Sequence, residues 1–209
     1  MIVRRKAKTE IPPLAADTYG GTLIGIVDVG EQEFQGKYRR QCILVFEIDG
    51  ETVEVDGEQQ PRWLSRIFTA SIDKKANLYS VLTSWLGGEI EDDEFNLSAL
   101  LGSPAMIAVS CRTSKDGGTY NFIDGVMKPP RSMQIAPAKS VEFEFDMDEP
   151  STYPALDVIP EWMRAMIERS PTWAKYTANS GRVLTSKDTE VQPESQEQTE
   201  TTAERKPAF

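Results

Sequence analysis

Residues 19–48 read YGGTLIGIVDVGEQEFQGKYRRQCILVFEI, and this run predicts two long β-strands joined by a short polar turn. The first strand is rich in β-branched and apolar residues, with Gly25 inside it and Gly30 at its end. Glycine within a strand allows the sharp coiling or bulge that the first strand of a small barrel needs. From Tyr38 to Ile48 the pattern is apolar on both faces in the middle, which predicts a strand that is covered on both sides.

The rest of the first 130 residues supplies three further strands and one helix. The expected elements are a possible short strand at 52–55, a third strand at 62–72, a helix at 77–86, a helical turn at 95–101, a fourth strand at 105–112 and a fifth at 119–127. We expect Asn77 to cap the helix, Gly87 and Gly88 to end it, and residues 116–118 to form a hairpin turn.

This order of elements predicts a mainly β fold, namely a five-stranded OB-fold-like barrel with a helix between strands 3 and 4. A jelly roll would need more strands, and a doubly wound sheet would need more helices. The helix face formed by Leu78, Val81, Leu82 and Trp85 is expected to plug the barrel.

Outside this barrel, assigned to residues 19–130, the composition changes. Residues 1–18 form a basic arm with Arg4, Arg5, Lys6 and Lys8, expected to be flexible and either inert or directed at phosphate. Residues 131–182 form an acidic connector and an amphipathic helix at 157–170, with Trp162, Met166 and Ile167 on one side. That helix either packs on the barrel or docks on a partner. Residues 183–209 form an acidic tail predicted to be disordered.

The overall composition excludes several classes of function. The chain has 209 residues, a formal net charge of −10 and no histidine, which removes Ser-His-Asp and Cys-His catalysis and histidine-containing zinc sites. Acidic residues such as Asp28 and Glu47 could bind magnesium in principle, but they fall at strand ends, so we expect no catalytic residues, no metal and no cofactor. The protein is therefore predicted not to be an enzyme.

The remaining sequence features concern redox state and location. Cys42 and Cys111 both lie in apolar runs and are expected to be buried, reduced thiols. The sequence shows no signal peptide and no apolar run near the length of a membrane span, so we expect a soluble cytoplasmic protein that does not engage membranes.

Cations and aromatic residues alternate along the strands and loops that an OB-fold uses for oligonucleotides, as single-strand binding requires. The predicted DNA-binding residues are Phe34, Lys37, Tyr38, Arg39, Arg40, Arg62, Trp63, Arg66, Arg112, Lys115, Tyr120 and Lys128. Alternatively, Phe46, Phe68 and Phe122 serve the core, Tyr38 and Trp63 serve either role, and Arg39 and Arg40 pair with Glu47 or Asp49 across the sheet.

The barrel segment resembles phage-encoded OB-fold single-stranded DNA-binding proteins. The resemblance covers residues 19–130 and lies in YGGTLIGIVDVGEQ, YRRQCILVFEI, KKANLYSVLTSWLG and LSALLGSP. It implies a non-catalytic protein of phage or prophage DNA replication or recombination, whose tail ends in a partner-recruiting phenylalanine. Phe209 matches that position, although Arg205 and Lys206 are basic where the family's tail is acidic just before the phenylalanine. A homo-oligomer is compatible with the sequence. The alternative function is a protein-interaction module that engages a host or replication protein through its acidic surface.

Overall fold

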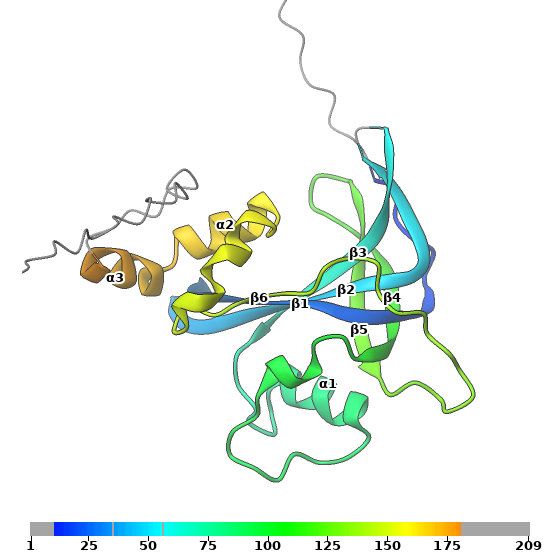
Figure 1. Ribbon diagram of the computed structural model, residues 1–209, viewed down its shortest axis with the longest axis horizontal. Helices are drawn as coiled ribbons and strands as arrows, with labels where there is room; N and C mark the ends of the chain where they lie inside the picture. Colours follow the sequence, from blue (N-terminus) through cyan, green and yellow to red (C-terminus); the bar gives the residue numbers. More distant parts are fainter. Residues whose placement is uncertain (1–10, 35, 56, 181–209) are drawn as a thin grey trace, which may run out of the picture.

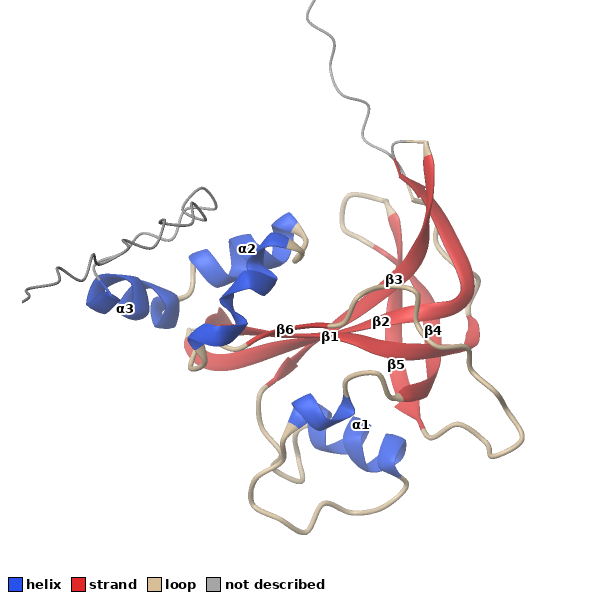
Figure 2. Cartoon of the chain, in the orientation of Figure 1, coloured by secondary structure: helices blue, strands red, loops and turns tan. Residues whose placement is uncertain are grey.

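The protein is described here by a computed structural model, which covers residues 11–34, 36–55 and 57–180. Five antiparallel strands form a curled half-barrel in the order β3-β2-β1-β4-β5 (Figures 1 and 2). They are β1 (Asp17–Phe34), β2 (Lys37–Val55), β3 (Glu58–Thr69), β4 (Pro104–Thr113) and β5 (Thr119–Met127). Helix α1 (Asn77–Leu86) and the 3-10 helix η1 (Leu97–Leu100) lie between β3 and β4. The OB-fold-like barrel is therefore confirmed.

Strand β1 organises the sheet because it pairs with two neighbours along its length. Residues 17–22 pair with β4, and residues 21–34 pair with β2. The β1–β2 register shifts between Leu23 and Gly25 and again between Asp28 and Gly30, where Gly30 adopts a φ of 65°. These bulges coil the strand, so that one strand serves both halves of the barrel.

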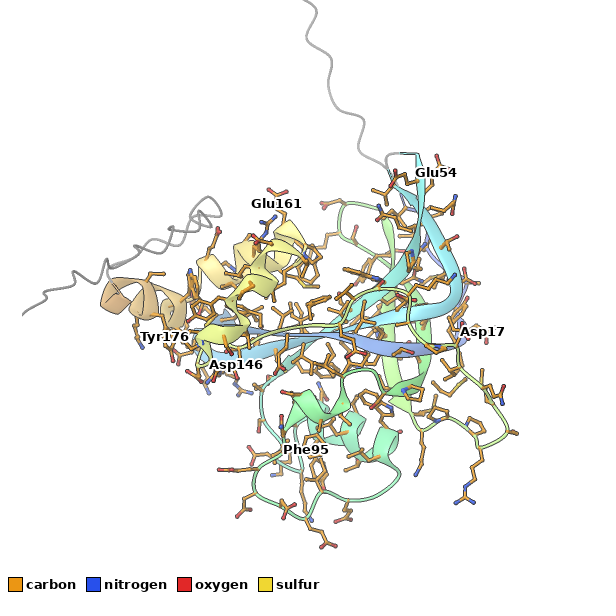
Figure 3. All side chains as sticks on the ribbon, in the orientation of Figure 1. Asp17, Glu54, Phe95, Asp146, Glu161 and Tyr176 are labelled. Atoms are coloured by element: carbon orange, nitrogen blue, oxygen red, sulfur yellow. The ribbon has the colours of Figure 1, made fainter. Side chains whose placement is uncertain are left out.

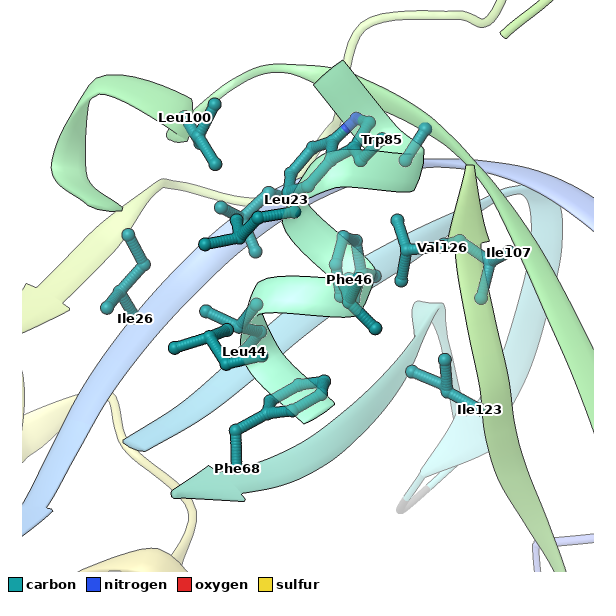
Figure 4. Close-up of a cluster of buried hydrophobic side chains, with 14 of the residues drawn as sticks. Leu23, Ile26, Leu44, Phe46, Phe68, Trp85, Leu100, Ile107, Ile123 and Val126 are labelled. Carbon is teal, nitrogen blue, oxygen red and sulfur yellow. The ribbon is translucent and has the colours of Figure 1, made fainter. Parts of the chain in front are cut away.

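The first hydrophobic core fills the barrel and is closed by α1 (Figure 4). Leu78, Val81, Leu82 and Trp85 are the buried residues of the helix, as predicted. The Trp85 ring packs 5.7 Å from the Phe46 ring, and its Nε1 donates to the Pro104 carbonyl at 2.8 Å. The helix ends at Gly87, whose φ is 76°. The predicted cap was wrong by one residue: the N-cap is Ala76, which offers no side-chain acceptor, and Asn77 is already helical.

Strands β3 and β5, the two ends of the strand order, are joined by arginine side chains instead of by a ladder within the described residues. Arg66 Nη1 donates to the carbonyl oxygens of Ile123 and Asp124, both at 2.9 Å. Arg62 is buried and donates to the Pro12 carbonyl at 2.7 Å and to Asn121 Oδ1 at 3.1 Å. The two Arg66 bonds satisfy carbonyl oxygens of β5 that a closed barrel would pair through its backbone.

A second hydrophobic core lies on the opposite face of β1 and β2, under the segment that follows the barrel (Figure 1). We call this segment the C-terminal cover: β6 (Phe143–Phe145), η2 (Pro150–Asp157), α2 (Glu161–Glu168) and α3 (Pro171–Ser180). Strand β6 runs parallel to β1, and Phe145, Tyr153 and Trp173 form a ring cluster with centroid distances of 5.5–5.9 Å. Of the two interpretations of the 157–170 region, packing on the barrel is the one observed.

Several predicted details of this region were wrong. The helix expected at 157–170 is shorter: η2 ends at Asp157, α2 spans Glu161–Glu168, and α3 follows from Pro171. Pro160 precedes the first residue of α2 and Pro171 is the first residue of α3, and proline favours such helix starts over helix interiors. Trp162 was expected on the apolar side, yet its side chain is 46% exposed, and Met163 is buried beside Met166 and Ile167.

Two strand bounds in the barrel also differ from the prediction. The short strand expected at 52–55 is the last part of β2, and β3, expected at 62–72, begins at Glu58 and ends at Thr69.

The two cysteines differ in environment. Cys42 is buried, and this burial raises the pKa of its thiol to about 12. Cys111 is exposed and donates to the Leu14 carbonyl at 2.9 Å, so the expectation that it is buried was wrong. Both are free thiols, as predicted. None of the helices in the described residues is long and apolar enough to cross a membrane.

Candidate nucleic-acid interface

A groove of about 670 Å³ lies between the start of β2, the end of β3 and the start of α1. We call it the β3–α1 groove. It is lined by Arg39, Gln41, Ile67, Phe68, Thr69, Ser71, Asp73, Lys75, Ala76 and Asn77. Ile67 stands on the outer face of β3 and remains 42% exposed, because the C-terminal cover packs on β1 and β2. The groove therefore joins an apolar surface to cationic walls.

The two cations of the β3–α1 groove are available to a ligand. Arg39 and Lys75 are both exposed, and among the described residues no carboxylate lies within ion-pair distance of either. The start of α1 has no side-chain cap, so its first N–H groups add partial positive charge at the same place. Asp73 opposes this charge, although Ser71 Oγ donates to its carboxylate at 2.9 Å. The arrangement suits a phosphate-bearing ligand.

The neighbouring Arg40 has a different role from Arg39. Its Nη2 lies 2.6 Å from Asp28 Oδ2, 2.7 Å from Asp148 Oδ2 and 3.6 Å from Asp146 Oδ1. The predicted partners Glu47 and Asp49 are therefore wrong. Because Asp28 belongs to β1 and the other two carboxylates follow β6, Arg40 joins the barrel to the C-terminal cover. Tyr176 of α3 extends the cluster by donating to Asp148. Figure 3 labels Tyr176 and Asp146 of this region.

Three further residues of the predicted set have internal partners. The guanidinium groups of Arg62 and Arg66 bind carbonyl and amide oxygens at the β3–β5 junction, and the guanidinium of Arg66 also lies 4.9 Å from the Phe68 ring centroid. The Trp63 ring packs 5.8 Å from Phe143, and its Nε1 donates to Ser140 Oγ at 2.8 Å. These contacts hold the barrel and its cover together, so we leave these three residues out of the proposed interface.

The β4–β5 hairpin brings together another part of the predicted set. Arg112 stacks 3.4 Å from the centroid of the half-buried Phe122 ring and pairs with Asp124 at 2.6 Å. Tyr120, opposite Arg112 in the ladder, is 45% exposed, and Lys115 is exposed in the turn. Lys128 instead donates to the Leu86 carbonyl at the end of α1, at 3.2 Å. Tyr120 and Lys115 thus remain accessible, whereas Arg112 is partly neutralised.

The remaining predicted residues lie near the β1–β2 turn or outside the described part of the chain. Lys37 is exposed, and Tyr38, at 55% exposure, is the most exposed ring of the predicted set in the described residues. Phe34 ends β1 opposite Lys37 in the ladder. Phe209, the predicted partner-binding residue, lies outside the described residues, as do most of the basic arm and the acidic tail.

The sequence interpretation missed Lys75 and Ile67. Lys75 belongs to a Lys-Lys pair just before α1, and Ile67 occupies an outward position of β3. Strand alternation alone could have identified Ile67 as a residue of the outer face. Only the fold shows that α1 begins next to the start of β2 and the end of β3. In the described residues no group of three or more carboxylate or cysteine side chains is placed to hold a metal ion.

Glu47 ties the segment just before the C-terminal cover to the barrel, and the pH dependence of stability tests this contact. Its burial would raise the pKa of its carboxyl, but hydrogen bonds from the Lys139 and Ser140 N–H groups, at 2.7 and 2.9 Å, lower the pKa below the ordinary value. Hydrogen bonds from Tyr176 and then Arg40 likewise lower the pKa of Asp148.

At pH values between the lowered and the ordinary pKa, these carboxyl groups bind protons in the unfolded chain but not in the folded protein. The stabilisation from these carboxylates is therefore complete above their ordinary pKa values, about 4, and is lost as pH falls through the lowered values. Urea unfolding between pH 7 and pH 3 should show this fall, and Glu47→Gln should make the pH dependence shallower. An unchanged slope in that variant would contradict the role assigned to Glu47.

The fold and these surfaces define a class of protein: an OB-like barrel whose outer face is covered over β1 and β2 by its own C-terminal segment and open over β3. Comparison of the chain with protein-family models and with curated protein sequences finds no match.

Proposed function

We propose that the protein binds single-stranded DNA without catalysis, through the β3–α1 groove and the accessible residues on either side of it. The observation that carries the proposal is the pair of exposed cations, Arg39 and Lys75, that line one groove together with the exposed Ile67. Single-strand binders combine cations that follow the phosphates with flat or apolar surfaces that meet the bases. Tyr38 and Tyr120 are exposed rings of the predicted DNA-binding set and are available for stacking.

Because one face of β1 and β2 is covered, only part of the outer face of the barrel can bind the DNA strand. An OB-fold binds oligonucleotides on its outer strand face between loops, and here β6, α2 and α3 occupy part of that face. We place the DNA strand outside the covered part, in the β3–α1 groove and at the β4–β5 hairpin, where Lys115 and Tyr120 are exposed. Backbone charge and stacking carry little sequence information, so we expect little sequence preference. The resemblance noted above favours a role in phage DNA replication or recombination.

A binding titration with a labelled poly-dT oligonucleotide tests this proposal. The double variant Arg39→Ala/Lys75→Ala should lose about tenfold in affinity at low salt and show a salt slope smaller by roughly 1.4, since each single-strand phosphate contact contributes about 0.7. Fluorescence anisotropy at several salt concentrations measures both quantities. The loss should be the same for mixed-sequence oligonucleotides.

The chain offers a closely matched control for this variant. Lys74 adjoins Lys75 in sequence but pairs with Glu89 at 3.5 Å and does not line the groove. Lys74→Ala should therefore change the affinity by less than about twofold. Its direct counterpart is the single variant Lys75→Ala, and equal losses of affinity in Lys74→Ala and Lys75→Ala would show a diffuse charge effect and reject the groove. No binding of the unaltered protein at low salt would reject the function itself, in favour of a protein-interaction module.

A further inference from the structure

A second groove, of about 300 Å³, lies at the other end of β3. We call it the Trp63 groove. It is lined by Ile11, Val53, Gln60, Pro61, Arg62 and Trp63. Most of this lining is apolar, and the guanidinium of Arg62 is committed to the Pro12 carbonyl and to Asn121. The Trp63 groove therefore offers apolar contact and no available cation among its lining residues.

The hairpin above this groove is acidic. We call residues 49–60, where the end of β2 pairs with the start of β3, the acidic hairpin: it contains five Asp or Glu residues and no Lys or Arg. Glu54 and Glu58 are exposed, and Glu51 is partly exposed. Figure 3 shows Glu54 on the hairpin, far from α1 and from the C-terminal cover. This charge is unfavourable for nucleic acid and favourable for a basic segment.

A basic segment precedes the described residues at this place in the sequence. Ile11 lines the Trp63 groove, and the residues after it are anchored: the Pro12 carbonyl accepts from Arg62, and the Leu14 N–H donates to Asn121 Oδ1 at 2.8 Å. The preceding residues include Arg4, Arg5, Lys6 and Lys8 against the single acid Glu10, a net charge of +3.

The lengths of the two segments match. Lys8 is three residues before Ile11, so their Cα atoms are at most about 11 Å apart. Glu58 is three residues before Pro61 along β3, a distance of about 10 Å. A chain that leaves the Trp63 groove along the hairpin thus has its first cation within reach of Glu58, and Lys6 and Arg5 within reach of the hairpin end.

From these observations we infer that the acidic hairpin and the Trp63 groove form a docking site for residues 4–8, the cationic part of the protein's own basic arm. The apolar groove fixes where the arm begins, and opposite charge holds the rest. One consequence rests on the proposed function: a docked arm is withheld from DNA phosphates, so the acidic hairpin lowers DNA affinity until DNA competes for the arm.

Zero-length carbodiimide crosslinking of the full chain, without DNA, tests the docking. Amide links from Lys6 or Lys8 should map by mass spectrometry to Glu51, Glu54 or Glu58, and their yield should fall at high salt. The variant Glu51→Gln/Glu54→Gln leaves Glu58 to react, and its yield should fall about fivefold because much of the attraction is gone. The variant Glu91→Gln/Glu94→Gln, in the acidic loop before η1, should leave that yield unchanged.

Two results would overturn the docking. Links from Lys6 and Lys8 that form equally with residues 89–94 would show unspecific attraction to an acidic protein. Links that join isotope-labelled to unlabelled chains in a mixed sample would assign the arm to a second copy.

A DNA titration addresses the consequence separately. Neutralising the acidic hairpin with the variant Glu51→Gln/Glu54→Gln should raise affinity about threefold in the full chain, and should have no effect in a chain lacking residues 1–10. The same increase in both chains would reject the masking. A protein that binds no DNA would reject the proposed function while leaving the crosslinking result intact.

Discussion

Replacing Gly25 with alanine should lower the free energy of unfolding by about 3 kcal/mol, the upper part of the usual range for overpacking. Gly25 lies at the first bulge of β1, opposite Phe143 of β6, and a Cβ at this position would overlap the Phe143 ring. The ring is buried in the second core, so it cannot move without disturbing the C-terminal cover. Chemical denaturation of the full chain measures the effect.

Two variants make the interpretation of Gly25 specific. At Gly125 of β5 an added Cβ would meet nothing within 4 Å, so Gly125→Ala should change stability by less than about 1 kcal/mol. Combining Gly25→Ala with Phe143→Leu should cost less than the sum of the two single changes, because the smaller side chain relieves the overlap. Additive costs would show that Phe143 is not the reason for glycine at this position.

Replacing Arg40 with alanine should lower the free energy of unfolding by about 2 kcal/mol. The change leaves the Asp28 carboxylate, whose side chain is only 12% exposed, without its ion pair. The Gly30 N–H at 2.9 Å would remain as a hydrogen-bond donor to Asp28. We expect the loss of stability to be smaller than for a fully buried ion pair, because the Arg40 side chain is itself 41% exposed. Urea unfolding measures the loss.

The adjacent Arg39 provides the matched control. Arg39→Ala should leave stability within about 0.5 kcal/mol, since the side chain is exposed and has no ion pair among the described residues. It should instead weaken DNA binding. Arg40→Lys should fall between the two in stability, because lysine retains the charge but not the paired contact of Nε and Nη2 with Asp28. If Arg39→Ala destabilises as much as Arg40→Ala, the division between a binding and a structural arginine is wrong.

The candidate site was only partly predictable from sequence. Composition and alternation identified the basic and aromatic residues on the strands. The local sequence pattern around a charged side chain is the same, however, whether that side chain faces solvent or a carboxylate from a distant segment. Asp146 and Asp148 lie more than 100 residues from Arg40 in the chain, and no local pattern connects them. The same reason applies to Trp63 and Ser140, which meet only in the folded protein.

The sequence by itself determined the barrel. Its alternating strands, the glycines of β1, the amphipathic face of α1 and the glycine that ends the helix are local signals, and each was found where expected apart from small shifts in bounds. Only the tertiary structure decided which face of the barrel stays open. Residues 143–176 cover β1 and β2 because their apolar side chains complete a second core with Ile24, Val27, Ile43 and Val45. Hydrophobic burial has no direction of its own, so an apolar pattern shows that a surface will be covered, and the packing of distant segments decides what covers it.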